Sequence, residues 1–187
     1  MQRRQFLSLA ASALPLFGAS ALAAQTDKAA KTTSGRTIGE MRSEWKRFLP
    51  AGATVPSPAP PLVLSPDEWR KRLSPDQYKV LREEGTERPG SSKLNAEKRR
   101  GTFACVACRL PLFTSEMKYE SGTGWPSFFT TIPGVFATKE DSLLFYTRVE
   151  YHCVRCGGHH GHVFRDGPPP TYERWCNNGA ALTFLPA

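Results

Sequence analysis

After Gly101 the sequence lacks any long stretch with helical periodicity, which argues against a helical domain there. It also has no internal repeat apart from two short cysteine motifs, which excludes a repeat architecture. Short β-type segments alternate instead with Gly- and Pro-rich turns. The segments are residues 102–104, 143–150, 162–164 and 180–185. We therefore expect a mainly β fold of two small antiparallel sheets, with a helical N-terminal edge, stapled together at the two cysteine motifs.

The same part of the chain lacks clustered positive charge, although the whole chain carries a formal net charge of +8. From Gly101 onward, seven Lys and Arg residues face seven Asp and Glu residues. The excess lies in the N-terminal arm and in the short run Lys98-Arg99-Arg100. Nucleic-acid binding needs clustered positive charge on the working face, so we expect no nucleic-acid partner.

The first 24 residues are predicted to be a secretion signal. Arg3 and Arg4 precede an apolar run that ends in the small-x-small pattern of residues 21–23, and paired arginines are typical of a twin-arginine signal. An uncleaved membrane anchor is the alternative, since the run is nearly long enough to span. We expect an exported, periplasmic protein with no stable membrane insertion after processing. Residues 25–61 are predicted to be a tether with one short helix, and residues 62–187 the folded domain.

Two helix starts open the folded domain. Ser65 and Ser74 are each followed by Pro at the first helical position and by Glu68 or Gln77 at the third. These patterns predict two short helices, which end near Leu73 and near residue 84.

Cysteine is scarce, and its spacing is informative. Four of the five cysteines form two Cys-x-x-Cys pairs, Cys105/Cys108 and Cys153/Cys156. Two such pairs are the ligand set of a closed tetrahedral zinc site, which has no open position for substrate. We therefore predict one structural Zn²⁺ per chain, with two disulfides or two redox pairs as the alternatives.

The fifth cysteine, Cys176, is the candidate reactive thiol. Arg174 lies two positions before it, on the same face of an extended strand, where its charge favours thiolate. His159 and His162 lie upstream, and imidazole beside a thiol is the usual pairing for sulfur chemistry. Two alternatives stand: a buried, inert Cys176, and a zinc site that uses the histidines.

These motifs, in this order, resemble those of the B-type methionine sulfoxide reductases, which reduce the R epimer of methionine sulfoxide. The resemblance covers about two-thirds of the chain, from Leu64 to the end. The matching segments are residues 73–78 (LSPDQY), 85–87 (GTE), 101–105 (GTFAC), 111–113 (PLF), 121–128 (SGTGWPSF), 159–164 (HHGHVF), 166–168 (DGP) and 174–178 (RWCNN).

The resemblance implies that Cys176 attacks the sulfoxide sulfur and becomes a sulfenic acid. It implies His162 as the acid for the sulfoxide oxygen, with His159 and Asn178 assisting and Arg174 lowering the thiol pKa. It further implies that Trp125 and Phe128 contact the substrate. Asp166 is expected to orient the histidine loop or a turn rather than to take part in the chemistry. The implied substrate is oxidised methionine in exported proteins.

Departures from the family pattern refine this picture. Many members carry a resolving cysteine where this chain has Thr123, so we expect an external thiol or a thioredoxin-like reductant to regenerate Cys176. His160, Tyr172, Glu173 and Asn177 replace Leu, Gly, Leu and an apolar residue, which puts substrate preference in doubt. The alternatives from other classes are a zinc-ribbon-like binding module for nucleic acid or protein, and a structural zinc protein.

Overall fold

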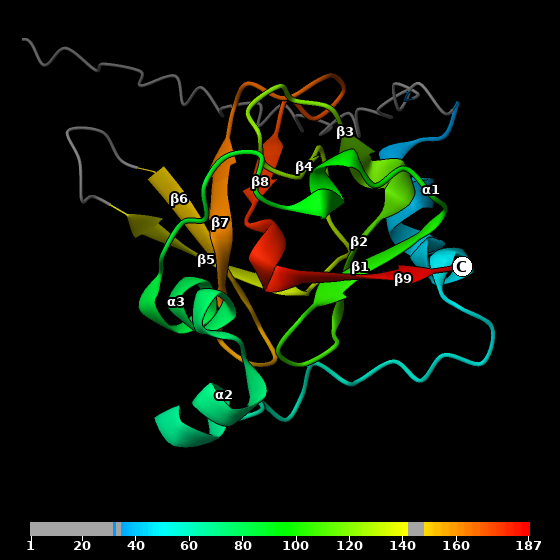
Figure 1. Cartoon of the computed structure of the whole chain (residues 1–187). Helices are drawn as coiled ribbons and strands as arrows, with labels where there is room; N and C mark the ends of the chain where they lie inside the picture. Colours follow the sequence, from blue (N-terminus) through cyan, green and yellow to red (C-terminus); the bar gives the residue numbers. More distant parts are fainter. Residues whose placement is uncertain (1–31, 33–34, 142–147) are drawn as a thin grey trace, which may run out of the picture.

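Two antiparallel sheets, packed together, make up most of the computed structural model, which describes residues 32, 35–141 and 148–187 (Figure 1). One sheet has the strand order β2-β1-β9, and the other has the order β3-β4-β8-β7-β6-β5. The strands are β1 (Gly101–Cys105), β2 (Pro111–Thr114), β3 (Lys118–Tyr119), β4 (Ser127–Phe128), β5 (Phe136–Asp141), β6 (Arg148–Cys153), β7 (His159–Phe164), β8 (Arg174–Asn177) and β9 (Leu182–Pro186). The predicted mainly β fold with two antiparallel sheets is confirmed.

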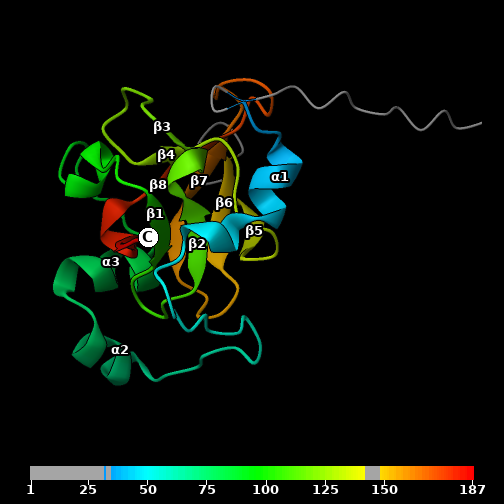
Figure 2. The same cartoon turned by 90° about the vertical axis from the view of Figure 1, so that its right-hand side faces the viewer.

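The three α-helices all precede the first strand in the chain, as expected, and in Figure 2 α1 lies on one side of the sheets while α2 and α3 lie on the other. They are α1 (Ile38–Ser43), α2 (Pro66–Arg72) and α3 (Pro75–Glu83), with 3-10 turns η1 (Trp45–Phe48), η2 (Lys93–Ala96), η3 (Ser115–Met117) and η4 (Gly179–Ala181). Both predicted capping boxes form: the Ser65 hydroxyl accepts from the Glu68 amide, and the Ser74 hydroxyl accepts from the Gln77 amide. The short helix expected inside the tether is α1, and its Met41 is buried in the core.

The predicted signal segment, residues 1–24, lies outside the described residues. Across the ranges that are described, no helix combines the length and the apolar character needed to cross a membrane.

The hydrophobic core joins the two sheets through aromatic rings. Phe113 of β2 stacks on Phe128 of β4 with 3.9 Å between ring centroids, and Phe103 of β1 meets Phe128 edge-on at 5.1 Å. All three rings are fully buried. Such aromatic pairs add stability beyond their buried area, so this cluster fixes how the sheets pack.

One predicted strand begins later than expected. Residues 180–185 were expected to be extended, but Gly179–Ala181 form η4 and β9 begins at Leu182. The amides of Gly179 and Ala180 donate to the Glu87 carboxylate at 2.6 and 2.8 Å, and this long-range pairing holds the turn. Gly179 also has no room for a side chain, since an added Cβ would lie 2.1 Å from Ser92 Oγ.

Candidate active site and metal centre

The four paired cysteines meet where two hairpins lie side by side, below the sheets in Figure 1. Cys105 ends β1 and Cys108 lies in the turn that follows, while Cys153 ends β6 and Cys156 lies in the next turn. Their sulfur atoms all lie within 4.8 Å of one another. The Cys105–Cys156 and Cys108–Cys153 sulfur distances are 3.7 and 3.6 Å, so each close pair joins the two hairpins.

This sulfur arrangement fits a tetrahedral metal and does not fit disulfides. A zinc–sulfur bond of about 2.3 Å gives tetrahedron edges of about 3.8 Å, close to the distances found. A disulfide would need sulfur atoms about 2.05 Å apart, whereas all five cysteines are free thiols. Each turn also has a left-handed residue four positions after its first cysteine, Arg109 at φ 63° and Gly157 at φ 67°. The two turns are therefore matching knuckles around one candidate zinc site.

Donors around the knuckles suit thiolate ligands. The Gly158 amide and the Arg82 guanidinium donate to the Cys156 sulfur, the latter at 4.0 Å, and Arg82 also donates to the Cys156 carbonyl at 2.9 Å. Because Arg82 lies on α3, this contact also fixes the helix against the site. His159 pairs instead with Glu150, so the cysteine cluster is complete without histidine.

Cys176 lies in a row of side chains that crosses the larger sheet. The strand register places Tyr119 opposite Ser127, Ser127 opposite Cys176, Cys176 opposite His162, and His162 opposite Glu150. Directly opposite residues of antiparallel strands point to the same face. The register alone therefore places the predicted acid, His162, beside the predicted nucleophile.

A cavity of about 160 Å³ opens over Cys176. Trp125 forms one of its walls and is held by an indole hydrogen bond of 3.2 Å to the Glu87 carbonyl. The lining residues are Thr86, Trp125, Arg148, Gly161, His162, Phe164, Cys176, Asn177 and Asn178. A pocket of this size, with an aromatic wall and a sulfur at its base, suits a small thioether side chain.

Opposing effects act on the Cys176 thiol. Burial raises its pKa above the usual value, while the charge and hydrogen bond of Arg174 and a hydrogen bond from Thr123 lower it. Arg174 therefore acts in the predicted direction but does not outweigh burial. Its guanidinium is held by two hydrogen bonds to Asp166, at 2.8 and 2.9 Å, so Asp166 positions Arg174.

This balance predicts the pH dependence of Cys176 alkylation in the free protein. Iodoacetamide reacts with thiolate, so the rate should rise with pH to a midpoint above the ordinary pKa of a cysteine thiol. Thr123→Val, which removes the hydroxyl but keeps the shape, should raise this midpoint further. Alkylation quenched at set times and read by intact mass measures both. A midpoint below the ordinary cysteine value would contradict the predicted balance.

His162 is braced by two charged residues. Its Nε2 lies 3.1 Å from the Asp141 carboxylate, which also pairs with Arg148. Burial and the nearby Arg148 charge lower the pKa of His162, and Asp141 opposes them. The imidazole is therefore mainly neutral at neutral pH.

His159 lies behind His162, with 5.6 Å between ring centroids, and does not line the cavity. Its ring is fully buried and pairs through Nδ1 with the Glu150 carboxylate. Burial lowers the pKa of His159 to about 4, so the ring is neutral. His159 thus buttresses His162 and Glu150 without direct access to a substrate in this cavity.

Two further predicted site residues have different surroundings from those expected. Phe128 was predicted to contact substrate, but it is fully buried between Phe103 and Phe113 and is a core residue. Asn178 does line the cavity, yet its side chain accepts from the Glu87 amide at 3.0 Å and donates to the His160 carbonyl at 3.0 Å. Asn178 therefore ties together the loops around Cys176.

Several residues of the site were not predicted from the sequence. Glu150 is buried beside His159 and Lys139. Glu87 forms hydrogen bonds with Trp125, with Asn178 and with the backbone of the η4 turn. Asp141 braces His162 from β5. Of these, only Glu87 lies in a segment that the motifs singled out, residues 85–87. The others lie on strands whose pairing the sequence does not specify.

Comparisons with known proteins agree on one family. Residues 73–186 match the SelR domain. The peptide methionine sulfoxide reductase MsrB of Methanosarcina barkeri is 51% identical over 64% of this chain and 85% of its own length. The MsrB proteins of Agrobacterium fabrum and Pseudomonas putida strain W619 are 45% and 48% identical, over 96% and 91% of their lengths and 68% and 64% of this chain.

Proposed function

The chain belongs to the SelR family of B-type methionine sulfoxide reductases, and we propose that it is a reductase with a single catalytic cysteine. We further propose that its substrates are exported proteins with oxidised methionine. It reduces the R epimer of peptide-bound methionine sulfoxide. One observation supports this mechanism above all: Cys176 lies directly opposite His162 at a cavity that Trp125 walls.

In the first step, the Cys176 sulfur attacks the sulfoxide sulfur while the oxygen accepts a proton. The bond formed between the two sulfur atoms and the sulfur–oxygen bond of the substrate then break, and the oxygen ends as a hydroxyl on the Cys176 sulfur. Methionine leaves as the thioether, and Cys176 becomes a sulfenic acid. Trp125 supports the substrate by packing against the methyl group of the sulfoxide.

The proton comes from the thiol itself. Since burial raises the pKa of Cys176 and lowers that of His162, the free enzyme rests as thiol and neutral imidazole. His162 takes the thiol proton and delivers it to the sulfoxide oxygen, which needs it to leave. Arg174 stabilises the thiolate as it forms.

An external thiol regenerates the enzyme. Thr123, whose side chain lowers the pKa of the nearby Cys176 thiol, stands where a resolving cysteine is expected, and the other four cysteines are assigned to the metal centre. An outside thiol attacks the sulfenic acid, which releases water and leaves a mixed disulfide on Cys176. A second thiol then frees Cys176 and leaves as the oxidised disulfide. If one turnover instead left a stoichiometric disulfide between Cys176 and another cysteine of the chain, this route would be wrong.

Cys105, Cys108, Cys153 and Cys156 hold Zn²⁺ in this proposal. Bound there, the metal supplies structure by crosslinking two hairpins, since four protein ligands leave it no open position. Export is supported by the twin arginines at the start of the chain. Zinc loaded in a reducing cytoplasm masks four thiols before they reach an oxidising periplasm.

The decisive experiment compares the two sulfoxide epimers. Purified protein is mixed with the R or the S epimer of N-acetyl-methionine sulfoxide amide and with excess dithiothreitol, and the thioether is measured by chromatography. We expect turnover of the R epimer alone. Equal turnover of both epimers, or none of either, would overturn the proposed function.

A further inference from the structure

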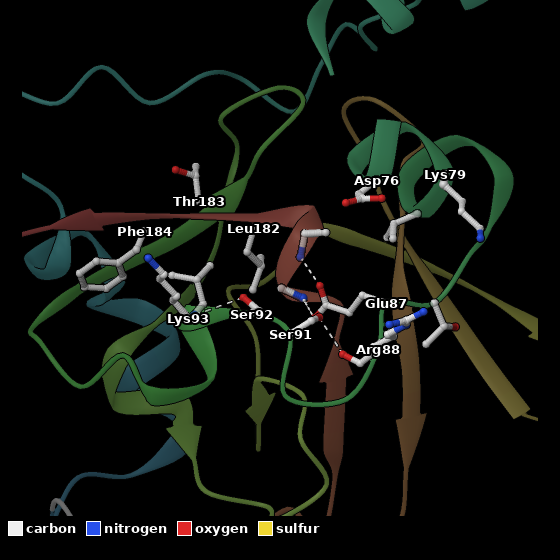
Figure 3. Close-up of a pocket in the computed structure, with 15 residues that line it drawn as sticks. Asp76, Lys79, Glu87, Arg88, Ser91, Ser92, Lys93, Leu182, Thr183 and Phe184 are labelled. Carbon is white, nitrogen blue, oxygen red and sulfur yellow. Dashed lines mark hydrogen bonds between the residues drawn. The ribbon is translucent and has the colours of Figure 1, made fainter. Parts of the chain in front are cut away.

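A second and larger cavity lies beside the catalytic one (Figure 3). This trough has a volume of about 830 Å³ and shares Thr86 with the catalytic cavity. Its lining comes from α3, the loop after α3, the 3-10 turns η2 and η4, and the start of β9. The residues around it are Asp76, Lys79, Val80, Thr86, Glu87, Arg88, Ser91, Ser92, Lys93, Leu94, Gly179, Ala180, Leu182, Thr183 and Phe184.

Glu87 links the trough to the catalytic cavity. Glu87 lines the trough, and its carboxylate binds the Gly179 and Ala180 amides, as the dashed lines of Figure 3 show. The backbone carbonyl of Glu87 holds Trp125, which walls the catalytic cavity. The trough is therefore fixed in position relative to Cys176, as an extended substrate subsite must be.

The rim of the trough carries unpaired positive charge. Lys79, Arg88 and Lys93 are exposed, and none forms an ion pair with a residue in the described ranges. Of the two carboxylates present, that of Glu87 is already bound by backbone amides, which leaves Asp76 as the only free acidic group of the lining. Leu94 and Phe184 add half-buried apolar surface to the lining, and Phe184 lies at the end of the trough that Lys93 marks in Figure 3.

We propose that this trough binds the polypeptide on one side of the oxidised methionine and favours flanking acidic residues. The methionine sulfoxide side chain enters the catalytic cavity, and the adjoining chain passes Thr86 into the trough. Aspartate and glutamate side chains there pair with Lys79, Arg88 and Lys93, while apolar parts rest on Leu94 and Phe184. This inference rests on the proposed function, because it needs a peptide-bound substrate at Cys176.

The test uses full-length protein and short blocked peptides of R methionine sulfoxide, flanked on both sides by Glu, by Lys or by Ser. We expect kcat/KM for the Glu peptide to exceed that for the Lys peptide by ~10-fold, as several exposed charge pairs together allow. The preference should shrink at high salt, since exposed charges are screened. The Arg88→Glu/Lys93→Glu variant should lose or invert it and still reduce N-acetyl-methionine sulfoxide amide normally.

A matched variant, Arg42→Glu/Lys71→Glu, makes the same charge change on exposed helical sites away from the trough and should keep the preference. An equal kcat/KM for all three peptides, or a preference that survives in Arg88→Glu/Lys93→Glu, overturns the trough assignment. The assignment is also overturned if Arg88→Glu/Lys93→Glu changes the KM for a protein reductant and leaves the peptide preference unchanged, because the trough would then bind that reductant. No turnover of the small amide by wild-type protein would overturn the proposed function instead, and binding of labelled Glu peptide to Cys176→Ser then tests the trough separately.

Discussion

Cys176→Ser is expected to lower kcat/KM for R methionine sulfoxide at least ~10³-fold, the scale seen when an enzyme loses its nucleophile. Serine is nearly isosteric, so the cavity, Trp125 and His162 should keep their places. Its hydroxyl is a far weaker nucleophile than a thiolate and cannot form a sulfenic acid. Thioether production by wild-type and variant protein under excess dithiothreitol measures the loss. Residual activity within tenfold of wild type would show that another group does the chemistry.

A second variant, Thr123→Cys, tests whether a cysteine at this position can resolve the Cys176 sulfenic acid. Because the Thr123 side chain is near enough to Cys176 to lower the pKa of its thiol, we expect a cysteine there to reach the sulfenic acid. The first turnover should remain, but it should end in a Cys176 disulfide within the chain. Mass spectrometry of protein treated with one equivalent of sulfoxide would show this disulfide, and wild-type protein serves as the control without it.

The sequence predicted those parts of the molecule whose signals are local. Ser65 and Ser74 each carry their whole capping box within four residues, so both helices start where expected. Each zinc knuckle is likewise a four-residue motif, and only the joining of the two knuckles needs the fold. The placement of Cys176 beside His162 came from family resemblance, and the β7–β8 register supplies its physical reason.

What could not be predicted depends on pairing over long sequence distances. Phe128 and Trp125 are neighbours in one motif, yet Phe128 points into the core and Trp125 into the cavity. The η4 turn replaces the start of a strand because a carboxylate 92 residues away binds its amides. The sequence pattern around Glu87 and the pattern around the η4 turn each give no sign of this hydrogen bond between them.

Two departures from the family pattern, His160 and Asn177, contact each other in the structure. His160 and Asn177 each replace an apolar residue, and both are buried. The Asn177 side-chain amide donates to the Tyr151 hydroxyl at 2.9 Å and lies 3.4 Å from His160 Nδ1. Burial lowers the pKa of His160 to about 4, so the pair is neutral. The pair replaces apolar packing without introducing a charge, and Asn177 Nδ2 is hydrogen-bonded. His160 Nε2 and Asn177 Oδ1 are buried and have no hydrogen-bond partner among the described residues, so the two changes leave polar atoms unsatisfied beside Cys176.

The four-cysteine site joins the two sheets of the fold. Cys105 ends a strand of the smaller sheet and Cys153 ends a strand of the larger one, so a metal held by the four cysteines would crosslink both sheets. Structural zinc in small domains contributes apparent binding free energies of about 10–16 kcal/mol, while a whole domain is stable by only about 5–15 kcal/mol. Zinc bound at these four cysteines would therefore contribute as much free energy as the stability of the whole domain.

Cys153→Ser, or removal of zinc by a strong chelator, is accordingly expected to unfold the domain and to abolish activity. The variant leaves three ligands, and the free thiolates would repel one another in a buried site. Circular dichroism should show loss of the cooperative thermal transition, and metal analysis should fall from about one zinc per chain, the number that a four-cysteine set binds, to none. Cys176→Ser is the matched control: it removes one thiol as well but should keep its zinc and its Tm. A chelated protein with an unchanged Tm and full activity would mean that the four cysteines hold the hairpins together without a metal.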